Sequence, residues 1–132
     1  MSPTTHSVRI LWQTLDANPS GTVYYGKTPD LGQKVTAETG WNVDGEGSVH
    51  VIELTGLEPF TEYYYQVGDE SRRYETICTA KTAPEKGTDF RLVAFSDVHD
   101  NDEKIWQNSA PIMLGVDPDM WITIGDLVNK GD

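Results

Sequence analysis

Three side chains in the last third of the chain combine the chemistry and the spacing of metal ligands. Asp97 and His99 follow the apolar run 92–95, and Asp126 follows a second apolar run, 120–124. Residues two apart on an extended chain point to the same side, about 6.6 Å along it, so Asp97 and His99 can bind one ion. Carboxylates with an imidazole suit manganese, iron or zinc, whereas an all-oxygen set would suit magnesium or calcium.

The two apolar runs predict neighbouring strands that bring these ligands together. Both are typical of buried parallel strands, and the apolar spacing over 102–114 predicts a helix between them, completing a βαβ unit. Parallel strands end at one edge of their sheet, where open α/β folds place their ligands. Asp126 is therefore expected to reach the same ion or to bridge to a second. Pro111 should kink or split the helix, and residues 117–119 should end it.

Each of these residues has a simpler structural explanation when it is taken alone. Asp97 could be a turn residue or a helix cap, as residues 100–102 are expected to be. Gly125 could merely permit a tight turn. The occurrence of Asp97, His99, Gly125 and Asp126 together, at the ends of consecutive buried strands, favours the metal site over these explanations.

The composition narrows the classes of partner. The net charge is −11, with 7 basic and 12 acidic residues up to Lys86 and 3 and 9 after it. Such a surface repels nucleic-acid phosphates, and no apolar run approaches membrane-spanning length, so neither nucleic acid nor a membrane is expected as a partner.

The single cysteine, Cys78, excludes an intramolecular disulfide and a thiolate zinc cage, and we expect it to be buried in a strand. Residues 1–6 contain no export signal. The compartment is left open, with export of the parent protein as one alternative.

The N-terminal part of the chain predicts a β-sandwich. Short segments of alternating apolar residues are separated by turn clusters, as in sandwich folds. These segments are 7–14, 22–26, 34–39, 48–54 and 63–67. Within the first of them, Val8, Ile10 and Trp12 share one face.

The most specific stretch of this part is 54–67, which contains the pattern Leu-x-Pro-x-Thr-x-Tyr. A corner forms at Pro59, and Tyr63 is placed to form a hydrogen bond back across it. The stretch resembles the fibronectin type III sandwich, and more closely the variant that precedes the catalytic domain of purple acid phosphatases and their relatives. The resemblance covers roughly residues 4–84. Because that variant has one strand before the strand of Trp12, the first strand is expected to be missing or shortened here.

The two C-terminal motifs resemble those of the calcineurin-like metallophosphoesterases. Asp97 and His99 match the family's Asp-x-His, and Gly125 and Asp126 match its Gly-Asp. The resemblance implies that the first pair holds one metal and that Asp126 bridges two. It also implies hydrolysis of phosphate monoesters or diesters by a metal-bound hydroxide, with two divalent ions about 3.5–4 Å apart. Purple enzymes have a tyrosine ligand where this chain has Asn129 and usually a glycine at the position of His99, so a coloured tyrosinate–iron centre is not expected.

Together these features predict a mainly β chain in three parts. A fibronectin III-like sandwich over 1–84 is followed by a linker over 85–89 and by the truncated start of a metallophosphoesterase domain, its first βαβ unit, over 90–132. The family's later ligand motifs are absent from the sequence, so the chain supplies three of about seven to nine ligands. We therefore expect a fragment with no complete catalytic site, inactive alone.

Two alternatives to a phosphoesterase fragment remain open. The chain could be a stand-alone fibronectin-like binding module without catalysis, or a metal-binding or regulatory protein that has lost catalysis. If the chain is a phosphoesterase fragment, Trp106 and Trp121 are expected to be buried against further polypeptide, because two parallel strands and one helix cover one face of a sheet at best. Self-association or mobility of the segment 90–132 follows as a prediction.

Overall fold

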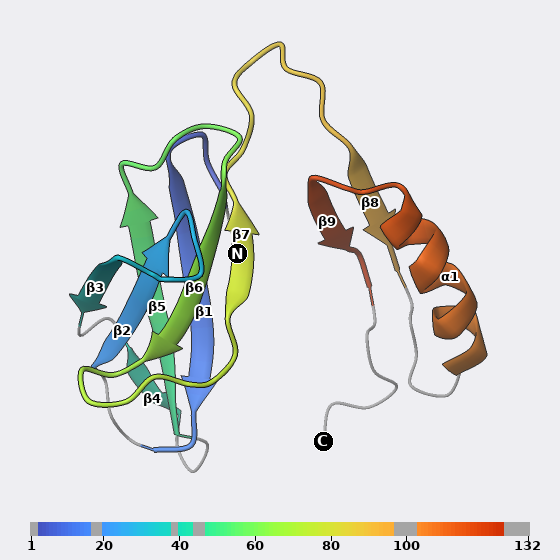
Figure 1. The fold of residues 1–132 in the computed structure, drawn as a ribbon. Helices are drawn as coiled ribbons and strands as arrows, with labels where there is room; N and C mark the ends of the chain where they lie inside the picture. The colour runs from blue at the N-terminus through green and yellow to red at the C-terminus, as the bar shows by residue number, and fades with distance from the viewer. Residues whose placement is uncertain (1–2, 17–19, 38–39, 44–46, 97–102, 126–132) are drawn as a thin grey trace. The chain divides into compact units, whose positions relative to one another are not determined.

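The computed structural model describes residues 3–16, 20–37, 40–43, 47–96 and 103–125. The chain divides into two compact units, an N-terminal unit over Met1–Lys86 and a C-terminal unit over Gly87–Asp132. Both are drawn in Figure 1. Each unit is described by itself below.

The N-terminal unit is a β-sandwich of two antiparallel sheets. One sheet has the strand order β1-β5-β4 and the other has the order β3-β2-β6-β7 (Figure 1). The strands are β1 (Ser7–Thr14), β2 (Gly21–Gly26), β3 (Gln33–Ala37), β4 (Trp41–Val43), β5 (Gly47–Thr55), β6 (Glu62–Gly68) and β7 (Cys78–Lys81). The mainly β, sandwich-like fold predicted from the alternating segments is confirmed.

Alternation along the strands builds one core between the two sheets. Val8 and Ile10 of β1 are each 1% exposed, and Trp12 packs at the margin of the same core. The buried members of the core are Val8, Ile10, Val23, Tyr25, Ile52, Leu54, Leu57, Tyr63 and Ala80. Burying an aliphatic or aromatic side chain of this size stabilises the fold by about 1.5–3 kcal/mol. The core therefore accounts for the cohesion of this unit without a disulfide.

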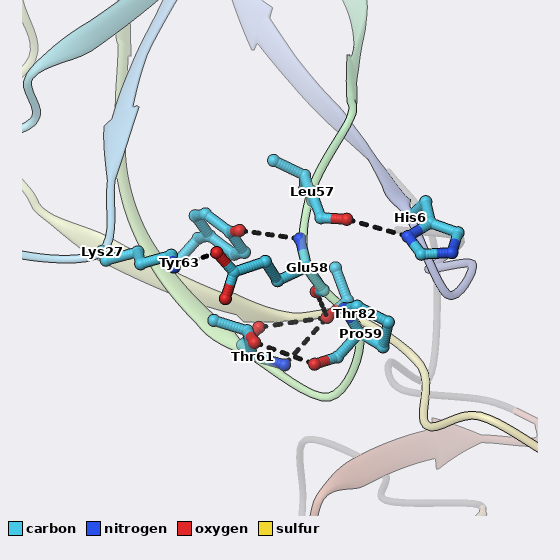
Figure 2. Close-up of polar contacts among 8 residues, drawn as sticks. All are labelled: His6, Lys27, Leu57, Glu58, Pro59, Thr61, Tyr63 and Thr82. Carbon is cyan, nitrogen blue, oxygen red and sulfur yellow. Dashed lines mark hydrogen bonds and ion pairs between the residues drawn. The ribbon is translucent and has the colours of Figure 1, made fainter.

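The corner before β6 forms as the sequence pattern predicts. The Tyr63 hydroxyl accepts a hydrogen bond from the Glu58 amide at 2.9 Å, across the turn that contains Pro59 (Figure 2). Lys27, the residue after β2, forms an ion pair with the Glu58 carboxylate. The His6 Nδ1 atom makes a hydrogen bond to the Leu57 carbonyl at 2.9 Å. The shape of this corner thus depends on contacts from β6 and from residues next to β1 and β2.

A threonine of the segment after β7 closes the corner from the other side. The Thr82 hydroxyl donates to the Glu58 carbonyl at 2.6 Å and accepts from the Thr61 amide at 2.9 Å (Figure 2). The Thr61 hydroxyl in turn donates to the Pro59 carbonyl at 2.8 Å. Thr82 is 2% exposed, so its hydroxyl satisfies backbone groups that water reaches poorly.

Cys78 is exposed, and the prediction that it is buried is wrong. It is the first residue of β7, which is an edge strand, and its cross-strand neighbour is Tyr65. Alternation alone placed Cys78 on the same face as Ala80, but the sandwich covers that face only from Ala80 onward. Burial, with Cys78 beside it, raises the pKa of Tyr65 to about 12.

The C-terminal unit is a βαβ unit. Its elements are β8 (Leu92–Phe95), α1 (Glu103–Gly115) and β9 (Met120–Thr123), and the two strands pair in parallel. Pro111 lies inside α1, which continues to Gly115 as one helix, so of the two outcomes expected at this proline, a kink or a split, the split does not occur. Within the described residues, no helix is both long enough and apolar enough to cross a membrane.

Candidate metal-binding edge

The two strands of the C-terminal unit end side by side. Phe95, the last residue of β8, lies opposite Thr123, the last residue of β9. One further hydrogen bond continues the ladder, from the Ile124 amide to the Phe95 carbonyl at 2.8 Å. The chain therefore leaves both strands at the same edge of the sheet, through Ser96 after β8 and through Gly125 after β9. We call this the carboxyl edge.

The predicted ligands lie just beyond the described part of this edge. Asp97 is two residues after Phe95, and Asp126 is three residues after Thr123. Asp97, His99 and Asp126 all lie outside the described residues, so their proximity to one another stays a prediction. Within the described ranges, no group of three or more His, Cys, Asp or Glu side chains could hold a metal ion.

Backbone geometry explains why the second motif has a glycine, Gly125. Its φ angle is +117°, a region that favours glycine because it has no Cβ atom. This geometry agrees with the simpler structural explanation of Gly125 given above, that it permits a tight turn. The chain therefore turns away from β9 immediately before Asp126.

An aromatic cluster lies directly behind the carboxyl edge. The Phe95 ring contacts the Trp106 ring of α1 with centroids 5.7 Å apart, and the Trp121 ring of β9 at 6.2 Å in an edge-on arrangement. Offset and edge-on aromatic pairs of this kind stabilise a fold by about 0.5–1.5 kcal/mol beyond their buried area. The cluster fixes the last residue of β8 with respect to both α1 and β9.

A polar clamp at the opposite end of the strands sets their register, and the sequence analysis missed it. The Asp119 carboxylate accepts a hydrogen bond from the Arg91 amide at 2.9 Å, and the Arg91 carbonyl accepts from the amides of Asp119 and Met120 at 2.9 and 3.2 Å. The Arg91 guanidinium donates to the Val116 carbonyl at 3.0 Å and to the Asp117 carboxylate at 2.8 Å. The only signal in the sequence was a Pro-Asp pair just before the second strand.

The C-terminal unit leaves most of its apolar side chains exposed. Every fully buried hydrophobic residue of the described chain belongs to the N-terminal unit. In the C-terminal unit the exposed large hydrophobic residues are Phe90, Leu92, Trp106, Ile112, Leu114, Val116, Trp121, Ile122 and Ile124. Both tryptophans are about two-fifths exposed, at 42% and 41%. A parallel sheet is ordinarily covered on both faces, so this unit has the surface of an incomplete α/β layer.

Comparison with known proteins identifies the family of the N-terminal unit. The family model described as "Purple acid Phosphatase, N-terminal domain" matches residues 1–82. The chain belongs to this family. Its hallmark corner, with Tyr63 bonded back to Glu58, lies inside the matched range. The purple acid phosphatase N-terminal domain does not include the predicted ligands Asp97, His99 and Asp126, which follow the matched residues.

A solved structure described as "Structure of PhoD" has a similar fold. It aligns with 95% of this chain at a TM-score of 0.72 and 17% sequence identity, which shows similarity of fold alone. The chain spans 26% of the length of that structure. No curated protein matches the chain by sequence. The N-terminal unit of this chain is thus known by family, and the chain is known by fold.

Proposed function

We propose that this chain is part of a metal-dependent phosphoesterase, in which the sandwich precedes a catalytic domain that begins with the C-terminal unit. The observation that supports this most directly is the parallel pairing of β8 and β9 with Phe95 opposite Thr123. Segments that follow the carboxyl ends of adjacent parallel strands share one edge of a sheet, which is the usual place for an active site in open α/β folds. The family of the N-terminal unit supports the same class of enzyme.

The residues proposed to bind metal are Asp97, His99 and Asp126. Two carboxylates and an imidazole form a donor set suited to manganese, iron or zinc. In this proposal Asp97 and His99 hold one ion and Asp126 bridges it to a second. Bound divalent ions would supply a hydroxide nucleophile at neutral pH and neutralise charge on the phosphoryl oxygens of a mono- or diester. Three ligands are too few for a two-metal centre, so the chain alone is expected to be inactive.

A metal titration tests the proposed site. Calorimetric titration of the full chain with Mn²⁺ should give weak binding that is lost in Asp97→Ala and in Asp126→Ala. Asp89→Asn is the matched control, because Asp89 is an exposed carboxylate in the same unit and lies before β8. The control variant should bind as the wild type does. Equal binding by the wild type and all three variants, or no binding by any of the four proteins, would rule out the proposed metal site.

An activity assay tests the proposed role of the chain. The full chain should not hydrolyse p-nitrophenyl phosphate in the presence of Mn²⁺ or Zn²⁺. Joined to the downstream sequence of its gene, it should hydrolyse the compound, and Asp126→Ala should abolish that activity. Failure of the longer protein to hydrolyse any phosphate ester would favour the alternative, a fibronectin-like binding module. That alternative predicts that a chain ending at Lys86 retains all binding.

The exposed apolar surface of the C-terminal unit leads to a proposal about self-association. Side chains such as Trp121 and Ile122 lie on β9 and are partly exposed, so another copy of the chain could cover them. Light scattering should detect oligomers of the full chain and a monomer for a chain that ends at Lys86. A monomeric full chain with slowly exchanging amides at residues 122–124 would contradict this proposal.

A further inference from the structure

A buried histidine in the N-terminal unit lies stacked on a tryptophan. Trp12 of β1 and His50 of β5 are directly opposite each other in the antiparallel pair. Their ring centroids are 4.8 Å apart and their planes differ by 14°. His50 is 2% exposed, which is unusual for a side chain that can become charged near neutral pH. The pair is not part of the predicted metal site.

Only one nitrogen of the His50 ring has a hydrogen-bond partner in the described structure. Its Nε2 atom lies 3.0 Å from the Thr14 hydroxyl. Its Nδ1 atom, like the indole nitrogen of Trp12, is buried without a partner among the described residues. A neutral imidazole has one N–H, whereas an imidazolium has two and carries a charge. Protonation in place would therefore bury an unpaired charged donor, which is costly.

The start of β2 encloses this stack closely. A Cβ atom placed on Gly21 would lie 2.6 Å from Cζ2 of Trp12 and 3.0 Å from Nδ1 of His50. Contacts under 3.0 Å do not occur without a shift of the neighbouring atoms. A side chain at position 21 would therefore collide with the stack, and glycine lets the start of β2 lie against both rings.

Two carboxylates face the histidine from neighbouring segments. A shallow polar cleft at this end of the sandwich is lined by Thr14, Asp16, Ser20, His50, Gly68, Asp69 and Tyr74. Asp69 already accepts three hydrogen bonds at one oxygen, from the amide and hydroxyl of Ser71 and the amide of Arg72, all at 2.7 Å. The charge of Asp16 favours an imidazolium, but desolvation of His50 outweighs it, so the pKa of His50 is lowered from its ordinary value.

We propose that the Trp12–His50 stack makes the N-terminal unit an acid-sensitive module. With neutral His50 the stack closes the end of the sandwich where β1 meets the start of β2. Protonated His50 is incompatible with that packing, so acid favours a state in which this end is open and the ring is hydrated. The device would let a purple acid phosphatase-type N-terminal domain respond to the pH of its compartment, whatever the parent hydrolyses.

The direction of the pH effect follows from linkage. In the unfolded or opened state His50 takes up a proton as the pH falls through about 6.5. In the closed state its pKa is lower, so the closed state binds fewer protons in this range. The stabilisation is fully present above pH 6.5 and decreases below it. Between the two pKa values the opening equilibrium constant should rise by up to about tenfold per pH unit.

Urea unfolding of the full chain at pH 7.5 and pH 5.5 tests the proposal while most carboxylates remain ionised. The wild type should have a lower midpoint at pH 5.5. His50→Gln, whose amide can still bond to Thr14, should lose at least half of that difference. His6→Gln is the matched control, because His6 is exposed, and it should keep the wild-type difference. An unchanged pH difference in folded His50→Gln would overturn the proposal.

An NMR titration of the wild type decides the matter if His50→Gln does not fold. The Cε1 proton of His50 and the indole N–H of Trp12 should change together, at a pH below about 6.5. Titration of His50 at about pH 6.5 with the Trp12 signal unchanged would overturn the proposal.

Discussion

Tyr63→Phe is the most direct test of the corner that defines the N-terminal unit. The substitution keeps the ring, which is 6% exposed and part of the core, and removes only the hydroxyl. The Glu58 amide then loses the acceptor that it has at 2.9 Å. An unsatisfied buried donor costs about 1–3 kcal/mol. Because Glu58 lies near the surface and water can partly replace the hydroxyl, we expect a loss of about 1–2 kcal/mol in the free energy of unfolding.

Urea unfolding monitored by circular dichroism measures this loss. In thermal unfolding, the melting temperature should fall by about 4–8 °C for each kcal/mol lost, for a unit of this length. Tyr64→Phe is the matched control, because Tyr64 is the next residue of β6, is half-buried, and makes no hydroxyl hydrogen bond with the described residues. It should change stability by less than about 0.5 kcal/mol. Equal effects of the two substitutions would refute the role assigned to the Tyr63 hydroxyl.

A double-mutant cycle extends the same test to the whole corner. Thr82→Val removes the hydroxyl that donates to the Glu58 carbonyl at 2.6 Å. Tyr63 and Thr82 bond to the two backbone polar groups of one residue, Glu58, so their effects should not add. We expect a coupling energy of about 0.5–3 kcal/mol between Tyr63→Phe and Thr82→Val, the range for residues that share a partner. Strict additivity would show that the two hydroxyls act independently.

Two further substitutions, one in each unit and each with a control, test a tight turn and the polar clamp. Gly47→Ala should destabilise the N-terminal unit by more than about 1 kcal/mol, because φ is +91° and the new Cβ atom would lie 1.9 Å from the Thr14 carbonyl oxygen. Gly32→Ala, with open space around it, should be neutral in the same urea experiment. Asp119→Ala should speed amide exchange in β9 several-fold by removing the clamp carboxylate, which is 10% exposed. Asp89→Asn changes an exposed carboxylate before β8 that is not part of the clamp, so it should leave that exchange rate unchanged, and equal rates in both variants would contradict the clamp.

Local patterns made the sandwich predictable from the sequence. The alternation of Val8, Ile10 and Trp12 specifies which face of β1 is buried, because successive side chains of a strand point to opposite faces. The Leu-x-Pro-x-Thr-x-Tyr pattern places an acceptor hydroxyl five residues after the amide that it satisfies. Alternation fails at Cys78, since whether a face is covered at the end of an edge strand depends on the partner sheet, which the local sequence does not encode.

Contacts between distant residues could not be predicted in the same way. The clamp joins Arg91 to Asp119 across 28 positions of sequence, and the local pattern predicted only that Asp119 follows the helix and precedes the second strand. The burial of His50 depends on Trp12 and on the close approach of Gly21, which the local sequence does not reveal. These features arise from the register of paired strands, which becomes known only when the fold is known.

The candidate metal site divides into a part that the backbone explains and a part that it does not. Gly125 needs no metal to account for it, because its φ of +117° is reason enough for a glycine there. The aligned strand ends at Phe95 and Thr123 likewise follow from parallel pairing. Neither fact requires a carboxylate or an imidazole in the segments that follow. The chemical argument for a phosphoesterase therefore depends on Asp97, His99 and Asp126, and the Mn²⁺ titration of their variants is the experiment that decides it.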